Sequence, residues 1–325
     1  MIRRTTLKAT LAMAAVTLLP PLAFAQESFP DRPLKVVVPF PPGGVVDVVA
    51  RAMAQRLSEK YGQPVIVENK AGAGGSIGTD LVAKAPPDGY TILMVGTGFT
   101  VLPQITKNLP WSTADFRAVL NIGSVPNIVV VHPDVPVNNV GELIALAKTS
   151  PHPPTYGSPG IGSSPHLSGE LLAQMAGVPL THVPYKGQPQ AVMDLLAGRL
   201  TMMALSAALA GPHLKTGKLR AIGVTADKRI VAHPELPSVA ETAGLTEYDV
   251  RPWTGVFVPA RTPESIARKL AADMMESLQL PDVKARMDTA GMELNPQPTT
   301  EFEAFVAAES KRWGAVLRKA GINAE

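Results

Sequence analysis

Apolar runs alternate with amphipathic stretches along the N-terminal part of the chain. Residues 34–38 are almost wholly apolar, which is typical of a strand buried on both faces. Residues 47–61 carry apolar side chains at every fourth position and stop at a glycine, which is typical of a helix. A second such pair spans 64–68 and 75–84, and a third apolar run spans 90–95. This alternation predicts an open parallel sheet with helices on both faces.

The alternation of apolar runs and amphipathic stretches begins again after Pro126. Near residue 253 we expect the chain to return to the first domain. The predicted strands of this middle part are 127–131, 154–156, 180–183, 201–205 and 219–224, and its predicted helices are 138–148, 164–176 and 189–197. A last predicted strand at 253–259 precedes a helix that we expect Thr262 to cap, and we expect a capping box at 300–303 to open the final helix. The pattern predicts two α/β domains, the second inserted in the first: 26–125 and 251–325 form domain 1, and 126–250 form domain 2.

Three glycine-rich segments, 40–44, 71–75 and 157–164, lie where a predicted strand turns into a predicted helix. The first backbone N–H groups of a helix have no intrahelical acceptor, and the helix dipole adds partial positive charge at that end. Glycine lets a ligand approach this backbone closely. Ligands of open α/β sheets bind outside the carboxyl ends of the strands, so we expect the three segments to line a cleft between the domains and to hold an anion.

Residues 1–25 have the features of an export signal. Basic residues precede an apolar stretch at 11–19, and Ala23–Ala25 forms an A-x-A cleavage site. We expect cleavage after Ala25 and an exported protein. The apolar stretch is too short to span a bilayer, which takes about 20 residues, and the remaining sequence offers no other candidate.

Composition narrows the function further. The predicted leader carries three of the 30 Lys and Arg residues and no acidic one, so the remainder is balanced against 27 Asp and Glu residues. No nucleic-acid partner is therefore expected. The chain has no cysteine, and its six histidines show no metal-site spacing, so we predict no disulfide, no metal and no cofactor.

The motifs, in their order along the chain, resemble the solute receptors of tripartite tricarboxylate transporters, the TctC-like or Bug family. The matching segments are Phe-Pro-Asp-Arg-Pro (29–33), Val-Pro-Phe-Pro-Pro-Gly-Gly-x-x-Asp (38–47), Gly-Gln-Pro-Val-x-Val-Glu-Asn (62–69), Gly-Ala-Gly-Gly-x-Ile-Gly (72–78), Ala-Pro-Pro-Asp-Gly-Tyr (85–90), Tyr-Gly-Ser-x-Gly-x-Gly-Ser-x-x-His (156–166), His-Val-Pro-Tyr-Lys-Gly (182–187) and Gly-Lys-Leu-Arg-Ala (217–221). The resemblance implies the two-lobed α/β fold of periplasmic binding proteins, a Venus flytrap in which each lobe is a sheet flanked by helices.

The resemblance also implies a function. It predicts a monomeric periplasmic receptor that closes on a small organic carboxylate and delivers it to the permease subunits of a membrane transporter. In that family the ligand carboxylate is held by the two N-terminal glycine loops, and the other end of the ligand meets the second lobe. The ligand-binding residues predicted in this chain are Pro42, Gly43, Gly44, Asp47, Ala73, Gly74, Gly75, Ser158, Ser163, Ser164, His166 and Ser206.

The chain departs from the common family pattern at three places. Val45 and Val46 stand where small or hydroxyl residues are frequent, and 96–100 stands where many relatives carry serines and a histidine. Ser206 stands where an acidic or amide residue is common. These departures favour a less polar substrate.

Each predicted contact also has a purely structural interpretation. The glycines can make tight turns, Asp47 can favour the dipole of the helix it opens, and Ser163 and Ser164 can act as N-caps. His166 can be a structural histidine. These interpretations stay open at the level of sequence.

The alternative function is an exported α/β hydrolase acting on a small ester, since Ser158 and Ser163 lie in loops with His166 nearby. The segment 162–166 lacks the G-x-S-x-G pattern of a nucleophile elbow, which argues against it. A dinucleotide site is poorly matched as well, because the sixth residue from Gly72 is Ile77 rather than glycine or alanine.

Overall fold

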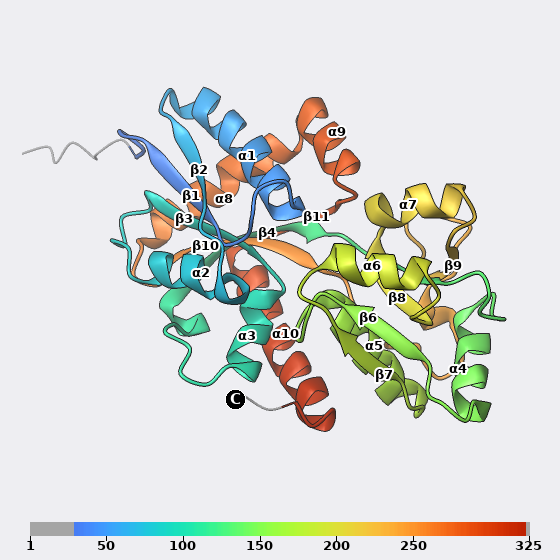
Figure 1. The fold of residues 1–325 in the computed structure, drawn as a ribbon. Coiled ribbons are helices and arrows are strands. Elements are labelled where there is room, and N and C mark those ends of the chain that lie inside the picture. Colours follow the sequence, from blue (N-terminus) through green and yellow to red (C-terminus); the bar gives the residue numbers. More distant parts are fainter. Residues whose placement is uncertain (1–28, 323–325) are drawn as a thin grey trace, which may run out of the picture.

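The computed structural model describes residues 29–322, so the predicted leader and its cleavage after Ala25 lie outside the described residues. The described chain forms two lobes, each a sheet flanked by helices (Figure 1). The strands up to Ser124 and from Trp253 onward belong to the larger lobe, and those from Asn127 to Val224 belong to the smaller one. The predicted two-lobed α/β fold is confirmed, while the domain boundaries near 126 and 250 stay predictions.

The larger lobe holds a six-stranded sheet in the order β11-β4-β10-β3-β1-β2. Its strands are β1 (Leu34–Val38), β2 (Val65–Asn69), β3 (Thr91–Gly96), β4 (Phe116–Ser124), β10 (Trp253–Pro259) and β11 (Glu293–Pro298). Its helices are α1 (Val45–Tyr61), α2 (Ser76–Ala83), α3 (Gly98–Ile105), α8 (Glu264–Leu278), α9 (Pro281–Thr289) and α10 (Thr299–Lys319), and 3-10 turns span Ala73–Gly75 and Thr113–Asp115.

The smaller lobe holds a five-stranded sheet in the order β7-β6-β8-β5-β9. Its strands are β5 (Asn127–Val131), β6 (Thr155–Ser158), β7 (Thr181–Pro184), β8 (Met202–Ser206) and β9 (Arg220–Val224). Its helices are α4 (Val140–Thr149), α5 (Ser164–Ala176), α6 (Gln188–Leu196) and α7 (Ala207–Lys215), and a 3-10 turn spans Val239–Glu241.

Both sheets are mixed, which corrects the prediction of a parallel sheet. β1 pairs in parallel with β2 and β3, whereas β10 is antiparallel to β3 and β4. The chain returns from the smaller lobe at Trp253, beside the carboxyl end of β3. β10 therefore runs in the opposite direction to β3. In the smaller sheet β5 is likewise antiparallel to β8 and β9.

Two predicted helix caps are wrong. α8 begins at Glu264 with Pro263 in the N-cap position, and the buried hydroxyl of Thr262 has no hydrogen-bond partner among residues 29–322. α10 begins at Thr299, one residue before the predicted box, and no side chain caps it. In both cases a proline with extended backbone angles precedes the helix and sets its entry.

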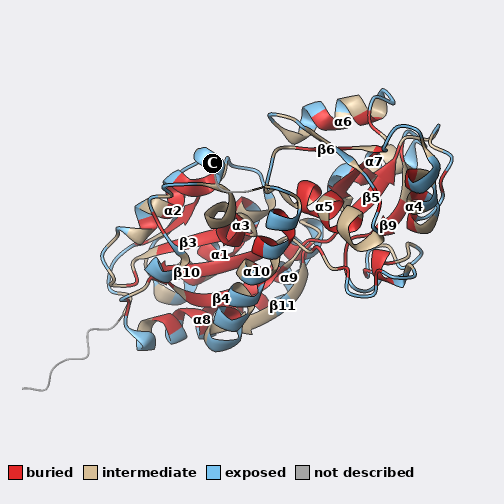
Figure 2. Cartoon of the chain, turned by 90° about the horizontal axis from the view of Figure 1, so that it is seen from below, coloured by how far each residue is buried: buried red, intermediate tan, exposed pale blue. Residues whose placement is uncertain are grey.

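The core of the larger lobe lies on both faces of its sheet, and Figure 2 shows the buried strands between covering helices. α1, α8 and α9 cover one face with side chains such as Met53 and Met274, and α2, α3 and α10 cover the other with Phe99 and Phe302. Alternate residues of β1 serve the two faces, as expected for a strand buried on both sides.

Apolar packing also joins the two lobes. Trp313 and Leu317 of α10 share one cluster of buried side chains with Leu167 and Leu171 of α5. Beside this cluster the Gln174 side-chain amide donates a hydrogen bond to the Val316 carbonyl at 2.7 Å. The chain passes between the lobes at two crossing segments, around 125–126 and 249–252. The C-terminal helix holds the smaller lobe on one side of these segments.

Candidate functional site between the lobes

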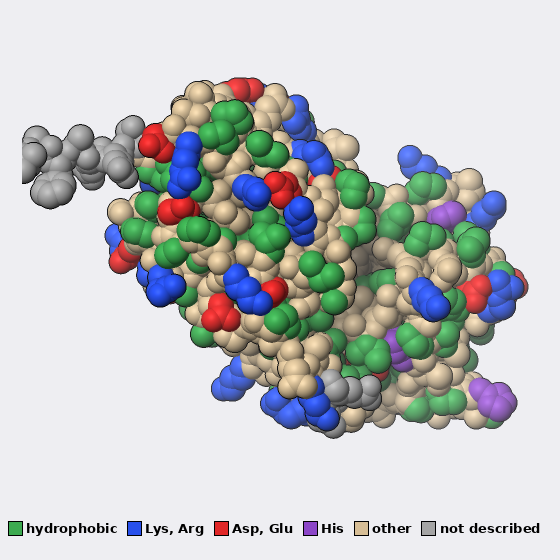
Figure 3. All heavy atoms as spheres, turned by 60° about the vertical axis from the view of Figure 1, so that its left-hand side comes forward, with side chains coloured by type: hydrophobic (Ala, Val, Ile, Leu, Met, Phe, Trp, Pro, Cys, Tyr) green, Lys and Arg blue, Asp and Glu red, His purple; other side chains and the backbone are tan. Residues whose placement is uncertain are grey.

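All three glycine-rich segments lie at carboxyl ends of strands, as predicted. The first loop (39–44) connects β1 to α1, the second loop (70–75) connects β2 to α2, and the third loop (159–163) connects β6 to α5. Figure 3 shows a hollow between the two lobes. A Cβ atom on Gly74 of the second loop would lie 3.2 Å from Leu102 of α3, and one on Gly162 of the third loop would lie 2.9 Å from Val101 of the same helix. The second and third loops thus both lie against α3.

Asp47 fastens the first loop to its helix. Its carboxylate is buried and accepts hydrogen bonds from the Gly43 N–H at 2.9 Å, the Arg51 guanidinium at 3.0 Å and the Asn69 amide at 2.9 Å. Burial opposes ionisation, but the hydrogen bonds from Arg51, Gly43 and Asn69 outweigh it and hold the pKa of Asp47 below its ordinary value. Arg51 and Asn69 were not among the predicted site residues. The spacing of four residues between Asp47 and Arg51 on one helix is the signal that indicates the pair.

The first loop leaves backbone donors free at the start of α1. The Gly43 N–H is taken by Asp47, and the first backbone bond of the helix runs from the Val48 N–H to the Gly44 carbonyl. The three preceding N–H groups, those of residues 45–47, have no acceptor within the helix. Pro42, Gly43 and Gly44 are all exposed, so this helix end is open to a solute.

The second loop forms a tight 3-10 turn. Ala73 and Gly74 have positive φ angles of 46° and 65°, and the Gly75 N–H donates to the Gly72 carbonyl at 2.9 Å. Ala73 and Gly74 are exposed, whereas Gly75 is buried. The turn therefore exposes its first two residues, while Gly75 is packed against Phe40 and Pro39.

The third loop is held by hydroxyl groups. The Ser163 hydroxyl donates to the Gly160 carbonyl at 2.6 Å, and the buried Ser158 hydroxyl accepts from the Gly160 N–H at 3.1 Å. Ser163 occupies the N-cap position of α5 without capping it through its side chain. The interpretation of Ser163 as an N-cap residue is confirmed for its position, but its hydroxyl closes the loop instead of capping the helix.

Asn127 links two of the predicted serines, although sequence reasoning did not select it. Its side-chain amide donates to the Ser164 hydroxyl at 3.1 Å, and its backbone pairs in register with Ser206 at the end of β8. Ser164 and Ser206 thus both neighbour Asn127, at the carboxyl end of β8. A polar residue that opens an otherwise apolar strand directly after Pro126 is the signal that could have indicated Asn127.

His166 lies beneath the third loop. Its ring has no exposed surface, and its Nδ1 accepts a hydrogen bond from the Gly162 N–H at 3.1 Å. The ring centroid of His182 lies 4.4 Å away, and the Nε2 of His182 lies 2.7 Å from the Ser158 hydroxyl oxygen. Burial lowers the pKa of His166 to about 3, with a further contribution from His182, and it lowers the pKa of His182 to about 4.

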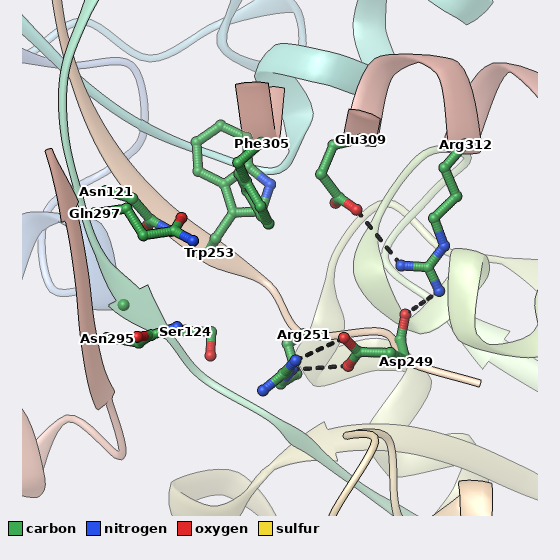
Figure 4. A pocket seen from close by; sticks show the side chains of 11 residues that line it. Asn121, Ser124, Asp249, Arg251, Trp253, Asn295, Gln297, Phe305, Glu309 and Arg312 are labelled. Atoms are coloured by element: carbon green, nitrogen blue, oxygen red, sulfur yellow. Dashed lines mark hydrogen bonds and ion pairs between the residues drawn. The ribbon is translucent and has the colours of Figure 1, made fainter. Parts of the chain in front are cut away.

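A separate cavity of about 60 Å³ lies at the hinge (Figure 4). It is lined by residues of β4, β11 and α10 together with Asp249, Arg251 and Trp253, and by none of the three glycine loops. Two buried groups on its wall, the Asn121 side-chain oxygen and the Trp253 indole nitrogen, have no hydrogen-bond partner among residues 29–322. Burial raises the pKa of Glu309, which accepts a hydrogen bond from the Trp313 indole at 2.8 Å.

Metal and membrane features are absent from the part of the chain that the structure describes. Within residues 29–322 no group of three or more histidine or acidic side chains is placed to hold a metal ion. In the same range no helix has both the length and the apolar character that crossing a bilayer requires.

Comparison with known proteins places this geometry in a family. A Pseudomonas protein from strain P51, described as a UPF0065 protein in the tcbD-tcbE intergenic region, is 39% identical over 299 residues, which cover 92% of this chain and 89% of the relative. The periplasmic binding protein BugD superposes with a TM-score of 0.75 at 34% identity, covering 91% of this chain and 100% of that one. An R. palustris protein solved with adipate superposes with a TM-score of 0.79 at 35% identity over the same shares of the two chains. The family model described as the tripartite tricarboxylate transporter family receptor matches residues 49–322, so the chain belongs to that receptor family.

Proposed function

We propose that the protein binds a small organic carboxylate in the cleft between its lobes. The observation that carries the proposal is the start of α1, where backbone N–H groups without intrahelical acceptors face outward from a loop that Asp47 fastens. Asp47 is the acid nearest these donors in sequence, and its charge is paired with Arg51 at 3.0 Å. Together with Ala73 and Gly74 of the second loop, this helix end suits one carboxylate group.

The second lobe offers neutral polar groups to the other end of the ligand. Ser164 and Ser206 both neighbour Asn127 at the carboxyl end of β8, and Ser163 lies in the third loop. A hydroxyl or amide can hold a second carboxylate through neutral hydrogen bonds, as it can hold a carbonyl or hydroxyl group. A dicarboxylate such as adipate, which one family member was solved with, fits this division.

We also propose that the protein works in the periplasm and passes its ligand to the permease subunits of a membrane transporter. The family assignment and the likeness to a periplasmic binding protein support this proposal. No catalytic step is assigned to the cleft, because a receptor needs only reversible binding and domain closure.

One observation favours the hydrolase alternative. The Ser158 hydroxyl oxygen lies 2.7 Å from Nε2 of His182. This is the distance expected between a nucleophile and its general base. However, Ser158 has no exposed surface, its oxygen already accepts from the Gly160 N–H, and a His182 pKa of about 4 makes a weak base. Among the described residues no carboxylate forms a hydrogen bond with the His182 ring to orient it. The pair is better suited to holding the loop than to attacking an ester.

A thermal-shift screen tests the proposal. A carboxylate at 100 times its Kd adds about 2.7 kcal/mol to the free energy of unfolding, which raises the melting temperature measurably. We expect a response to one or more aliphatic mono- or dicarboxylates and no turnover of nitrophenyl esters. A response to zinc or NAD alone, or ester hydrolysis that is lost in Ser158→Ala, would contradict the proposed function.

A further inference from the structure

The backbone of the third loop is fastened to two histidines from different elements. The Gly162 N–H donates to Nδ1 of His166, which lies on α5. The Gly160 N–H donates to the Ser158 hydroxyl, which is in turn 2.7 Å from Nε2 of His182 on β7. Two of the loop's N–H groups are therefore fixed by side chains that lie outside the loop.

The hydrogen bond from Gly162 determines the tautomer of His166. A neutral imidazole has one donor nitrogen and one acceptor nitrogen, so a ring that accepts at Nδ1 carries its proton on Nε2. That Nε2 has no hydrogen-bond partner among the described residues, and the nearest acidic oxygen, from Glu170, lies 3.8 Å away. A protonated ring would have a proton on Nδ1 as well and could not accept the Gly162 N–H.

The two rings are packed as one unit. The ring centroids of His166 and His182 lie 4.4 Å apart. The ring of Tyr156 stacks on that of His182, with a centroid distance of 5.0 Å. The Tyr156 hydroxyl donates to the Glu170 carboxylate at 2.5 Å, which fixes the stack at its far end. The Ser158 contact is satisfied in either tautomer of His182, because a hydroxyl both donates and accepts.

We propose that His166 and His182 are positioning residues of the ligand site: as neutral rings they fix the backbone of residues 159–163, and neither touches the ligand. This inference rests on the proposed function, since the third loop is the part of the smaller lobe that faces α3 and the cleft. His166 was predicted to contact the ligand, but its ring has no exposed surface. We propose instead that it supports the loop from beneath, through the hydrogen bond from the Gly162 N–H. The proposal also adds His182, which sequence reasoning did not select.

Paired substitutions separate hydrogen bonding from packing. Asparagine places its side-chain oxygen near the position of Nδ1, so His166→Asn keeps an acceptor for the Gly162 N–H, whereas His166→Leu fills space without one. Glutamine reaches the position of Nε2 and both donates and accepts, so His182→Gln keeps the Ser158 contact and His182→Leu removes it. We expect each leucine variant to weaken adipate binding by about tenfold, in line with one lost hydrogen bond, while each amide variant stays within about threefold of wild type.

A second measurement needs no ligand. Hydrogen exchange of the Gly160 and Gly162 amides should speed up by about tenfold in the leucine variants and stay near the wild-type rate in the amide variants. Folded leucine variants with wild-type adipate affinity and wild-type exchange rates would overturn the inference. Amide variants that lose as much adipate affinity as the leucine variants would overturn it as well.

A third measurement applies if the leucine variants fail to fold. Nitrogen-15 chemical shifts of the wild-type histidines report the protonation of each ring. His166 must be neutral with its proton on Nε2, and a cationic or Nδ1-protonated ring overturns the inference. Wild-type protein that binds no carboxylate would contradict the proposed function, while exchange and tautomer would still test the positioning role.

Discussion

The carboxylate of Asp47 accepts a hydrogen bond from the backbone N–H of Gly43, four residues earlier, at 2.9 Å. This bond closes the first glycine loop onto the helix that follows it. It also takes one N–H away from any ligand, so the donors left for a carboxylate are those at the start of α1. In the proposed anion site Asp47 is thus a support, and Gly43 would contribute the shape and exposure of the loop more than its N–H.

Replacement of Asp47 should cost both stability and affinity. Asp47→Ala leaves the Gly43 N–H without its acceptor. It also removes one of two acceptors from the Asn69 amide, which keeps the Phe40 carbonyl, and one of two from Arg51, which keeps the Asn69 side-chain oxygen. We expect a loss of about 1–3 kcal/mol in the free energy of unfolding, measured by urea denaturation, and weaker binding of adipate. Asp47→Asn is the matched control, because it keeps an acceptor oxygen for Gly43 and should recover part of both losses. Full affinity in a folded Asp47→Ala protein would show that the first loop does not hold the ligand.

A new charge at Ser163 tests whether the third loop faces the anion. At ~4 Å and an effective dielectric constant of about 20, the repulsion between two carboxylates is on the order of 4 kcal/mol. Ser163→Asp should therefore bind a carboxylate at least about a hundredfold more weakly, since each 1.4 kcal/mol is a factor of about ten. Ser163→Ala is the control, because it loses the same hydrogen bond to the Gly160 carbonyl without adding charge. Equal affinities for the two variants in calorimetry would mean that Ser163 lies away from the negative end of the ligand.

The sequence predicted the three loops and their neighbouring helices because each is local: a short apolar run, glycines, then an amphipathic helix. It did not predict β11, whose Pro296 and Pro298 read as loop residues although an edge strand tolerates proline. It missed β4 as a strand because polar residues such as Asn121 interrupt the apolar run. Asn127 and His182 were missed as site residues because their contacts join segments that are far apart in sequence. Arg51 was missed although its spacing of four residues from Asp47 indicates the pair.

Ligand binding should close the hinge. The two crossing segments meet where the Val125 N–H donates to the Pro252 carbonyl at 2.7 Å, and α10 packs on the smaller lobe beside them. We expect small-angle scattering to give a smaller radius of gyration with saturating adipate than without it. Trp253 lines the hinge cavity, so its fluorescence should change on binding and the change should be absent in Trp253→Phe. An identical scattering profile at saturation would argue against closure.

His166, which is buried, and His182, which is partly buried, predict how stability depends on pH. Their folded-state pKa values, about 3 for His166 and about 4 for His182, lie below the ordinary 6.5, so the unfolded chain binds protons more readily. Their contribution to stability is complete above about pH 6.5 and is lost as the pH falls below it, by about 1.4 kcal/mol per unit for each ring. Glu170 faces His166 at 3.8 Å and favours its protonation, but burial outweighs this attraction.

Urea denaturation between pH 7.5 and pH 5.5 measures this contribution. The double variant His166→Asn/His182→Gln should show a shallower loss of stability than wild type, by about 2–3 kcal/mol at the lower pH. Parallel curves for the two proteins would mean that the histidines are not buried as neutral rings.

Calorimetric titration with adipate and with adipamide tests the carboxylate site most directly. The two molecules share their carbon chain, and only adipate carries the charges that backbone N–H groups at a helix start favour. The account predicts saturable binding of adipate, or of a shorter dicarboxylate that outcompetes it, and at least a hundredfold weaker binding of the corresponding diamide, which is about 2.7 kcal/mol. Equal affinity for the acid and the diamide, or no saturable heat with any aliphatic mono- or dicarboxylate, would contradict it.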